Sequence, residues 1–243
     1  MKLIAAQIAC PARLGADNLE RHVSVIEHAA RLHAAALYFP ELSLTGYSPS
    51  LARQHARHLD DPRLATFQHA SDRHQMLIAI GVPTWHANAV QISLVVFQPG
   101  QSPVGYAKQW LHADETAFFA PGERNRLFDV QGHRLAPAIC YESLQAEHAQ
   151  GMADAGAQAY LASVAKSARG VLAAQQHYPH IARRHAMPVL MANAVGPVEG
   201  FACAGGSAVW SAEGMLLCQA GPDTEALVTY DLVTGQAETV AMA

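Results

Sequence analysis

Hydrophobic and polar positions form blocks along the chain. Short and almost continuously apolar runs are separated by stretches in which apolar residues recur at helical spacing or turn-forming residues gather. Apolar runs without alternating polar positions are typical of strands that are covered on both faces of a sheet. The predicted strands are Leu3–Ile8, Leu37–Phe39, Met76–Val82, Ile92–Phe97, Leu135–Cys140, Ala159–Val164, Val189–Ala192, Ala208–Trp210, Met215–Cys218 and Ala226–Tyr230.

Four helices are predicted between these strands from apolar spacing and from helix start and stop signals. Proline inside a helix removes a backbone hydrogen bond, so Pro179 is expected to kink or restart the fourth helix. The four helices are marked by Leu19, Val23, Ile26 and Ala30 for the first, by Asp61-Pro62 at the start of the second, by Ala146–Ala155 before Gly156 for the third, and by Val171–Ala186 for the fourth.

The order of the elements predicts an α/β fold. Strands and helices alternate through the first two-thirds of the chain, and the last third is rich in hairpin-like runs, a pattern typical of mixed sheets. A chain of 243 residues suffices for one large core. Because the sequence contains no linker, repeat or low-complexity tract, we expect a single domain over residues 1–243.

Composition excludes several classes of protein. Apolar residues make up 51% of the chain and charged residues 15%, which argues against disorder. The formal charge of −4 gives no basic excess for nucleic acid, and no apolar run approaches the roughly 20 residues that cross a bilayer. The four cysteines form no CxxC pair, and His177 and His180 lack a third ligand nearby, so no metal is expected. We expect a soluble, cytoplasmic protein.

Three strand ends carry a reactive side chain each, namely Glu41, Lys108 and Cys140. The crevice beyond strand ends is where α/β sheets bind ligands. A thiol needs a base or a cation to react at neutral pH, and a partly buried carboxylate such as Glu41 supplies the base. Lys108 and the backbone N–H of Tyr141 would then stabilise an oxyanion. Each residue alone is more typical of a surface charge or a buried cysteine, so the combination carries the prediction.

The segments around these residues resemble the nitrilase, or carbon–nitrogen hydrolase, superfamily. The resemblance extends over essentially the whole chain, and its three motifs follow one another in the order found in that family. The matching segments are Pro40–Tyr47, then Tyr106–Lys108 with Leu111, Glu115 and Phe119–Glu123, then Ala138–Ser143, together with Gly81–Pro83, Ala192–Gly196 and Gly206–Ser207.

The resemblance implies a four-layer αββα sandwich with two mixed β-sheets, paired as a homodimer. It implies Cys140 as the nucleophile, Glu41 as the general base and Lys108 as the oxyanion stabiliser, while Glu115 helps to position substrate and lysine. The reaction it implies passes through a thioester acyl-enzyme and needs no metal or cofactor.

The residue after Cys140 indicates which branch of the superfamily the chain resembles. Tyr141, directly after Cys140, is similar to the amidase branches, whereas nitrilases usually carry tryptophan there. Because the chain holds no synthetase domain and no membrane segment, we expect neither a glutaminase domain nor a lipoprotein acyltransferase. The predicted activity is hydrolysis of a non-peptide carbon–nitrogen bond in a small amide, either an ω-amide or an N-carbamoyl compound. The alternatives are nitrile hydrolysis, a Cys–His acyl hydrolase or transferase, and a catalytically idle dimeric interaction module.

The candidate substrate-binding residues are Tyr47, Glu142, Ser163 and Lys166. In the family, the segment corresponding to Ala162–Arg169 lines the acyl pocket. Its two cations, at positions 166 and 169, are suited to bind a carboxylate at the far end of the substrate, and an arginine can do so with two hydrogen bonds. The alternative is that both cations point into solvent.

Overall fold

A computed structural model of the protein describes residues 1–12 and 16–242. Across these residues the strands form two large mixed sheets and one small hairpin. The first sheet has the order β15-β14-β1-β2-β3-β4-β5, and its strands are β1 (Lys2–Gln7), β2 (Ala34–Tyr38), β3 (Leu77–His86), β4 (Ala89–Phe97), β5 (Val104–Ala107), β14 (Ala226–Asp231) and β15 (Ala237–Ala241). Strands β1, β2 and β3 run parallel, and the other pairs are antiparallel.

The second sheet has the order β13-β12-β9-β8-β7-β6. Its central strands β7, β8 and β9 are parallel to one another. Its strands are β6 (Phe128–Val130), β7 (His133–Ile139), β8 (Ala159–Val164), β9 (Val189–Asn193), β12 (Ala208–Trp210) and β13 (Leu216–Gln219), and the hairpin consists of β10 (Val195–Val198) and β11 (Phe201–Ala204).

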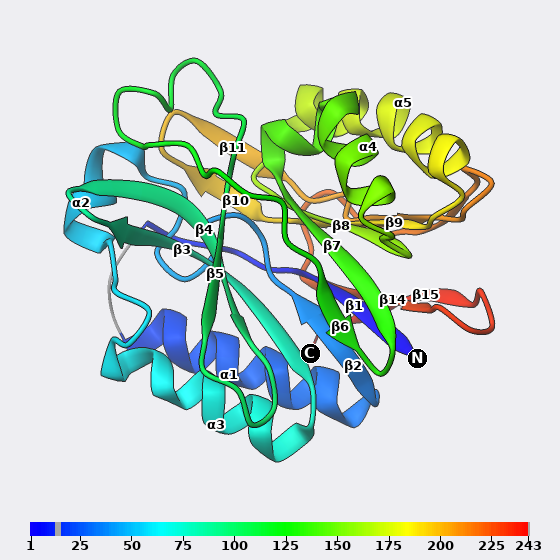
Figure 1. The fold of residues 1–243 in the computed structure, drawn as a ribbon, viewed down its shortest axis with the longest axis horizontal. Coiled ribbons are helices and arrows are strands. Elements are labelled where there is room, and N and C mark those ends of the chain that lie inside the picture. The colour runs from blue at the N-terminus through cyan, green and yellow to red at the C-terminus, as the bar shows by residue number, and fades with distance from the viewer. Residues whose placement is uncertain (13–15, 243) are drawn as a thin grey trace.

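The two sheets face each other and helices cover their outer faces (Figure 1). Strand β1 packs against β9, and β12 packs against β14, so the sheets share one interior. The helices are α1 (Ala16–Arg31), α2 (Ala52–His55), α3 (Ala65–His74), α4 (Ala146–Asp154) and α5 (Ala168–His185), with short 3₁₀ turns η1 (Pro49–Leu51), η2 (Pro62–Leu64) and η3 (Cys140–Leu144). Helices α1 and α3 cover the first sheet, and α4 and α5 cover the second, which confirms the predicted αββα sandwich.

Helix α5 differs from its prediction at both its start and its middle. It begins at Ala168 because the Ser167 side chain caps it by accepting a hydrogen bond from Gly170 N. The helix also runs through Pro179 without restarting. Buried apolar side chains lie on both sides of Pro179, including Tyr178 and Ile181. Their packing against the second sheet outweighs the one backbone hydrogen bond that proline removes.

Among the described residues, none of the helices combines the length and the apolar character that crossing a membrane requires.

Candidate active site

Glu41 is held by a tight turn just beyond the end of β2. The turn lies so close to β3 that a Cβ on Gly81 would come within 2.3 Å of both Pro40 O and Leu42 N. Only glycine therefore fits at this position of β3. Leu42 adopts a left-handed backbone conformation with φ of 51°, which is rare for a residue with a side chain. The turn buries Glu41, whose exposed fraction is 1%.

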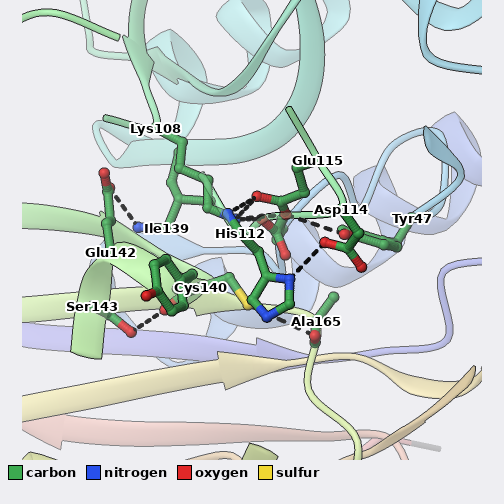
Figure 2. A network of polar contacts seen from close by, with 12 residues as sticks. Tyr47, Lys108, His112, Asp114, Glu115, Ile139, Cys140, Glu142, Ser143 and Ala165 are labelled. Atoms are coloured by element: carbon green, nitrogen blue, oxygen red, sulfur yellow. Dashed lines mark hydrogen bonds and ion pairs between the residues drawn. The ribbon is translucent and has the colours of Figure 1, made fainter. Parts of the chain in front are cut away.

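Lys108 follows β5 and reaches into the protein between two carboxylates. Its Nζ lies 2.8 Å from Glu41 Oε1 and 2.7 and 2.9 Å from the two oxygens of Glu115. Glu115 is fixed in turn by the Tyr47 hydroxyl, which donates to Oε1, and by the backbone N–H of His112, which donates to Oε2. Figure 2 shows the side chains of Lys108, Glu115 and Tyr47 converging in this way. The ammonium is thus fully enclosed and donates hydrogen bonds to both carboxylates.

The charges in this cluster shift one another's pKa values. Burial alone would lower the pKa of Lys108, but the charges of Glu41 and Glu115 raise it above the ordinary lysine value. Burial raises the pKa of Glu41, and Lys108 opposes that shift. One oxygen of Glu41, Oε2, is buried without a hydrogen-bond partner among the described residues. The lysine therefore stays charged, and the glutamate keeps one free oxygen for a proton.

Cys140 stands at the junction between β7 and the 3₁₀ turn η3. Its φ of 44° places it in the left-handed region, so the backbone turns sharply at this residue. The thiol lies 3.7 Å from Ala165 O and is partly exposed. Burial and the charge of Glu41 raise its pKa to about 11, while Lys166 and Lys108 act in the opposite direction. The resting thiol is therefore protonated and needs a base.

The backbone N–H of Tyr141 lies in the first turn of η3, where backbone donors have no carbonyl partner inside the helix. It follows directly after the nucleophile candidate, as a second oxyanion donor would. The Tyr141 side chain is 37% exposed and stands edge-on to His112, with ring centroids 5.3 Å apart.

Glu142 is fully buried behind these residues. Its Oε1 accepts hydrogen bonds from Ile139 N at 2.8 Å and from the Tyr106 hydroxyl at 2.8 Å, and its Oε2 accepts one from Gln109 N at 2.7 Å. It thereby ties the residue before Cys140 to the residue after Lys108. Glu142 thus braces the site from behind, and its contact with substrate stays a prediction.

A chain of buried polar groups continues from Glu142 into the protein. His148 Nε2 lies 2.8 Å from the Tyr106 hydroxyl, and His148 Nδ1 lies 2.6 Å from the Tyr160 hydroxyl. Because Tyr106 donates its proton to Glu142, it accepts from Nε2–H, and Nδ1 then accepts from Tyr160. Burial lowers the pKa of His148 to about 4, which keeps the imidazole neutral. The sequence placed Tyr106 in a matching segment beside Lys108, but it gave no sign that His148 and Tyr160, which are distant in the chain, would join it.

A cavity of about 400 Å³ opens above Cys140. It is small enough to favour a small molecule as its occupant. Its walls are formed by Tyr47, His112, Asp114, Glu115, Cys140, Tyr141, Leu144, Ala165, Lys166, Ser167, Gly170 and Phe201. A second cavity of about 580 Å³ lies at the edge of the first sheet around Tyr106, and none of Glu41, Lys108 and Cys140 lines it. The cavity that contains Cys140 is therefore the candidate substrate site.

The predicted binding residues separate into two groups around this cavity. Tyr47 and Lys166 line it. Ser163 is fully buried, and its Oγ has no hydrogen-bond partner among the described residues. Arg169 is exposed and does not line the cavity. Phe201, which meets Tyr47 edge-on at 5.6 Å, could not be predicted because hairpin β10–β11 carries no strong strand pattern.

The fold defines a class of protein, and comparison with solved structures supports that class. The NitN amidase from Nesterenkonia sp. AN1 superposes with a TM-score of 0.85 at 23% identity, covering 95% of this chain and 92% of that one. A variant of that amidase in complex with butyramide gives the same TM-score of 0.85 at 22% identity, over 94% of this chain and 89% of that one. The protein thus has the fold of a nitrilase-superfamily amidase.

A family model described as carbon-nitrogen hydrolase matches residues 4–242. The chain therefore belongs to the carbon–nitrogen hydrolase family, and the predicted resemblance is confirmed. Among curated proteins, the glutamine-dependent NAD(+) synthetases of Aquifex aeolicus and of Xylella fastidiosa strain Temecula1 are each 29% identical, over 51% and 58% of this chain. The matched stretches cover only 22% and 27% of the length of those relatives.

Proposed function

We propose that the chain is an amidase that hydrolyses small amides through a thioester on Cys140. The observation that carries this proposal is the Lys108 ammonium, which Glu41 and Glu115 hold at 2.7–2.9 Å inside the protein, beside the thiol. An enclosed cation of this kind is preorganised to stabilise negative charge that develops on a bound carbonyl oxygen. The family to which the chain belongs supports the same chemistry.

In the acylation half of the proposed reaction, Glu41 takes the proton of the Cys140 thiol while the sulfur attacks the amide carbonyl carbon. Lys108 Nζ and the N–H of Tyr141 donate hydrogen bonds to the resulting oxyanion. The protonated Glu41 then gives its proton to the amide nitrogen, the carbon–nitrogen bond breaks, and ammonia or an amine leaves. The product of this half is a thioester on Cys140.

In the deacylation half, Glu41 takes a proton from a water molecule, and the resulting hydroxide attacks the thioester carbonyl. The same two donors hold the second oxyanion. The carbon–sulfur bond then breaks, the thiolate recovers its proton from Glu41, and the carboxylic acid leaves. One amide and one water therefore give one acid and one ammonia or amine.

Glu41 fits the role of base better than a histidine does. The Cys140 thiol lies 3.7 Å from Ala165 O and also hydrogen-bonds with the Glu41 carboxylate, whereas no hydrogen bond joins it to a histidine within residues 1–12 and 16–242. Glu41 offers the free oxygen Oε2 in the same buried cluster. This geometry supports the amidase mechanism over a Cys–His hydrolase.

The substrate class follows from the size of the cavity and from the relatives. A volume of about 400 Å³ suits a small amide, such as an ω-amide or an N-carbamoyl compound. The names of the matched proteins refer to glutamine in one case and butyramide in the other, and both molecules carry a primary amide.

We further propose that residues 1–243 form a single carbon–nitrogen hydrolase domain and that the protein is cytoplasmic. We also propose that it is a homodimer, which light scattering after gel filtration would test.

The test of this function combines product release with mapping of the reactive thiol. Ammonia release is measured with butyramide, the monoamide of succinic acid, N-carbamoyl-β-alanine and butyronitrile, and acrylamide labelling is mapped by mass spectrometry. We expect Cys140→Ser to lose both turnover and labelling, and Cys203→Ser, at a thiol buried in β11, to keep both. A label on Cys10, Cys203 or Cys218, or undiminished turnover in Cys140→Ser, would contradict the proposal. Turnover of butyronitrile alone would favour a nitrilase.

A further inference from the structure

Lys166 is a second buried lysine in the same cavity. Its exposed fraction is 5%, and it lines the cavity together with Cys140. Unlike Lys108, it has no carboxylate or other side-chain partner for its ammonium among the described residues. A buried charge without a partner is costly, since its lost hydration is not replaced. A cation left in this state faces the space that a ligand would occupy.

The backbone of Lys166 is fixed from several sides. Its N–H donates to Asn193 Oδ1 at 2.8 Å, and its carbonyl accepts from Asn193 Nδ2 at 3.1 Å and from Ala204 N at 2.9 Å. The aliphatic stem packs against the first turn of α5, because a Cβ on Gly170 would lie 3.1 Å from Lys166 Cβ and 3.3 Å from Cγ. The side chain is thus prepositioned, so less conformational entropy is lost when a ligand binds to it.

The surroundings of Lys166 add positive potential at a helix terminus, and of the two carboxylates that also line the cavity, Asp114 and Glu115, Glu115 is already paired with Lys108. Helix α5 begins at Ala168, and Ser167 and Gly170 of its N-terminal turn also line the cavity. The N-terminus of a helix carries free N–H groups and the positive end of the helix dipole. Leu144 and Phe201 add apolar surface to the cavity wall, and Tyr47 adds a ring. The Cys140 thiol, whose pKa of about 11 keeps it neutral at rest, does not supply the missing negative charge.

We infer that Lys166 determines specificity by binding a carboxylate at the end of the acyl group opposite the scissile amide. The substrates are therefore short amides that carry a carboxylate, and the product is a dicarboxylic acid or a comparable dianion. This inference rests on the proposed function, because it takes Cys140 to attack the carbonyl at the other end. Arg169, which is exposed and outside the cavity wall, has no part in it.

The test compares two amides that differ only in the distal group. The monoamide of succinic acid and butyramide have the same chain length, with a carboxylate in one and a methyl group in the other. We expect the wild type to prefer the carboxylate in kcat/KM by roughly 10- to 150-fold, the range typical of a hydrogen bond to a charged group. Lys166→Met removes the charge at similar length, so this ratio falls toward one, and Lys166→Arg restores part of it. Arg169→Met is the matched control and keeps the wild-type ratio.

A binding measurement separates this inference from the proposed function. In the Cys140→Ala background, calorimetry gives Kd for the same two amides with and without Lys166→Met. Tighter binding of the carboxylate that Lys166→Met abolishes supports the inference, even if neither amide is hydrolysed. Equal binding of the two amides overturns the inference, even if both are hydrolysed. An equal loss of kcat/KM on both substrates in Lys166→Met also overturns it, since Lys166 would then serve the thiolate.

Discussion

Lys108 and Lys166 are both buried lysines beside Cys140, yet their surroundings are opposite. Lys108 is fully enclosed and makes three contacts with the carboxylates of Glu41 and Glu115. Lys166 has an exposed fraction of 5%, stands in the cavity wall and has no anionic partner among the described residues. One charge is neutralised by the protein itself, and the other is left open toward the cavity.

This difference separates two uses of a buried cation. A cation that is already held by fixed carboxylates has little freedom to reorient, so it favours charge that develops at one defined point during a reaction. A cation without a partner gains most when a ligand brings a full negative charge. We therefore expect changes at Lys108 to affect all amides alike, and changes at Lys166 to affect only amides that carry a carboxylate.

The largest expected effect is that of Lys108→Met. Loss of an oxyanion donor typically costs about 100- to 1,000-fold in rate, and the loss should be the same for butyramide and for the monoamide of succinic acid. The variant also leaves Glu41 and Glu115 buried without their cation, so we expect destabilisation of about 3–5 kcal/mol. Steady-state kinetics on both amides and urea unfolding measure the two effects.

Lys108→Arg, which keeps the charge, serves as the folding control for this experiment. Circular dichroism on each variant establishes that any loss of rate comes from a folded protein. A loss in Lys108→Met that fell mainly on the carboxylated amide would break the distinction between the two lysines. A rate close to that of the wild type would remove Lys108 from the mechanism.

A smaller effect is expected at Glu142, which braces the side of the site where Lys108 lies. Glu142→Gln replaces one acceptor oxygen by an NH₂ group, which cannot accept from Gln109 N or Ile139 N. An unsatisfied buried donor costs about 1–3 kcal/mol. Because these donors neighbour Lys108 and Cys140, we expect kcat to fall about tenfold while KM changes little.

The pH dependence of the free energy of unfolding tests the raised pKa of Glu142. Burial raises its pKa from 4.5 to about 7. Between these values the unfolded chain has lost the proton and the folded chain keeps it, so the contribution of Glu142 to stability falls as pH rises. Glu142→Gln does not titrate, and its deficit relative to wild type should therefore shrink by up to about 3 kcal/mol between pH 5 and pH 8. The exposed Glu147→Gln is the control, and a deficit independent of pH would contradict the shifted pKa.

Much of the catalytic side of the site could be predicted from the sequence. Glu41, Lys108 and Cys140 each follow an apolar run, and such runs end at one crevice when they are buried strands of α/β sheets. Glu115 followed from the family resemblance, and the structure places it against Lys108. The three strand-end predictions depended on local patterns, and the structure brings Glu41, Lys108 and Cys140 into one cluster.

Features that depend on contacts far apart in the sequence could not be predicted. Hairpin β10–β11 lacks a long apolar run, and its position depends on Glu199, which accepts hydrogen bonds from Ser48 and Ser50 about 150 residues earlier. The left-handed backbone of Cys140 and the bracing position of Glu142 arise in the same way from tertiary contacts. The sequence placed Lys166 and Arg169 in one candidate segment, and only the direction of helix α5 distinguishes them.

The smallest expected effect is that of Gly170→Ala, which tests the positioning of Lys166 without touching its charge. The new Cβ would lie 3.1 Å from Lys166 Cβ, so the lysine stem must shift by a few tenths of an ångström. We expect the preference for the carboxylated amide to fall about two- to fivefold, less than in Lys166→Met. Alanine inside a helix is more favourable than glycine by about 0.5–1 kcal/mol. The free energy of unfolding should therefore fall by less than the close Cβ contact alone would cost. An unchanged preference, measured as the ratio of kcat/KM for the two amides, would show that the packing of the stem against α5 does not set the position of the ammonium.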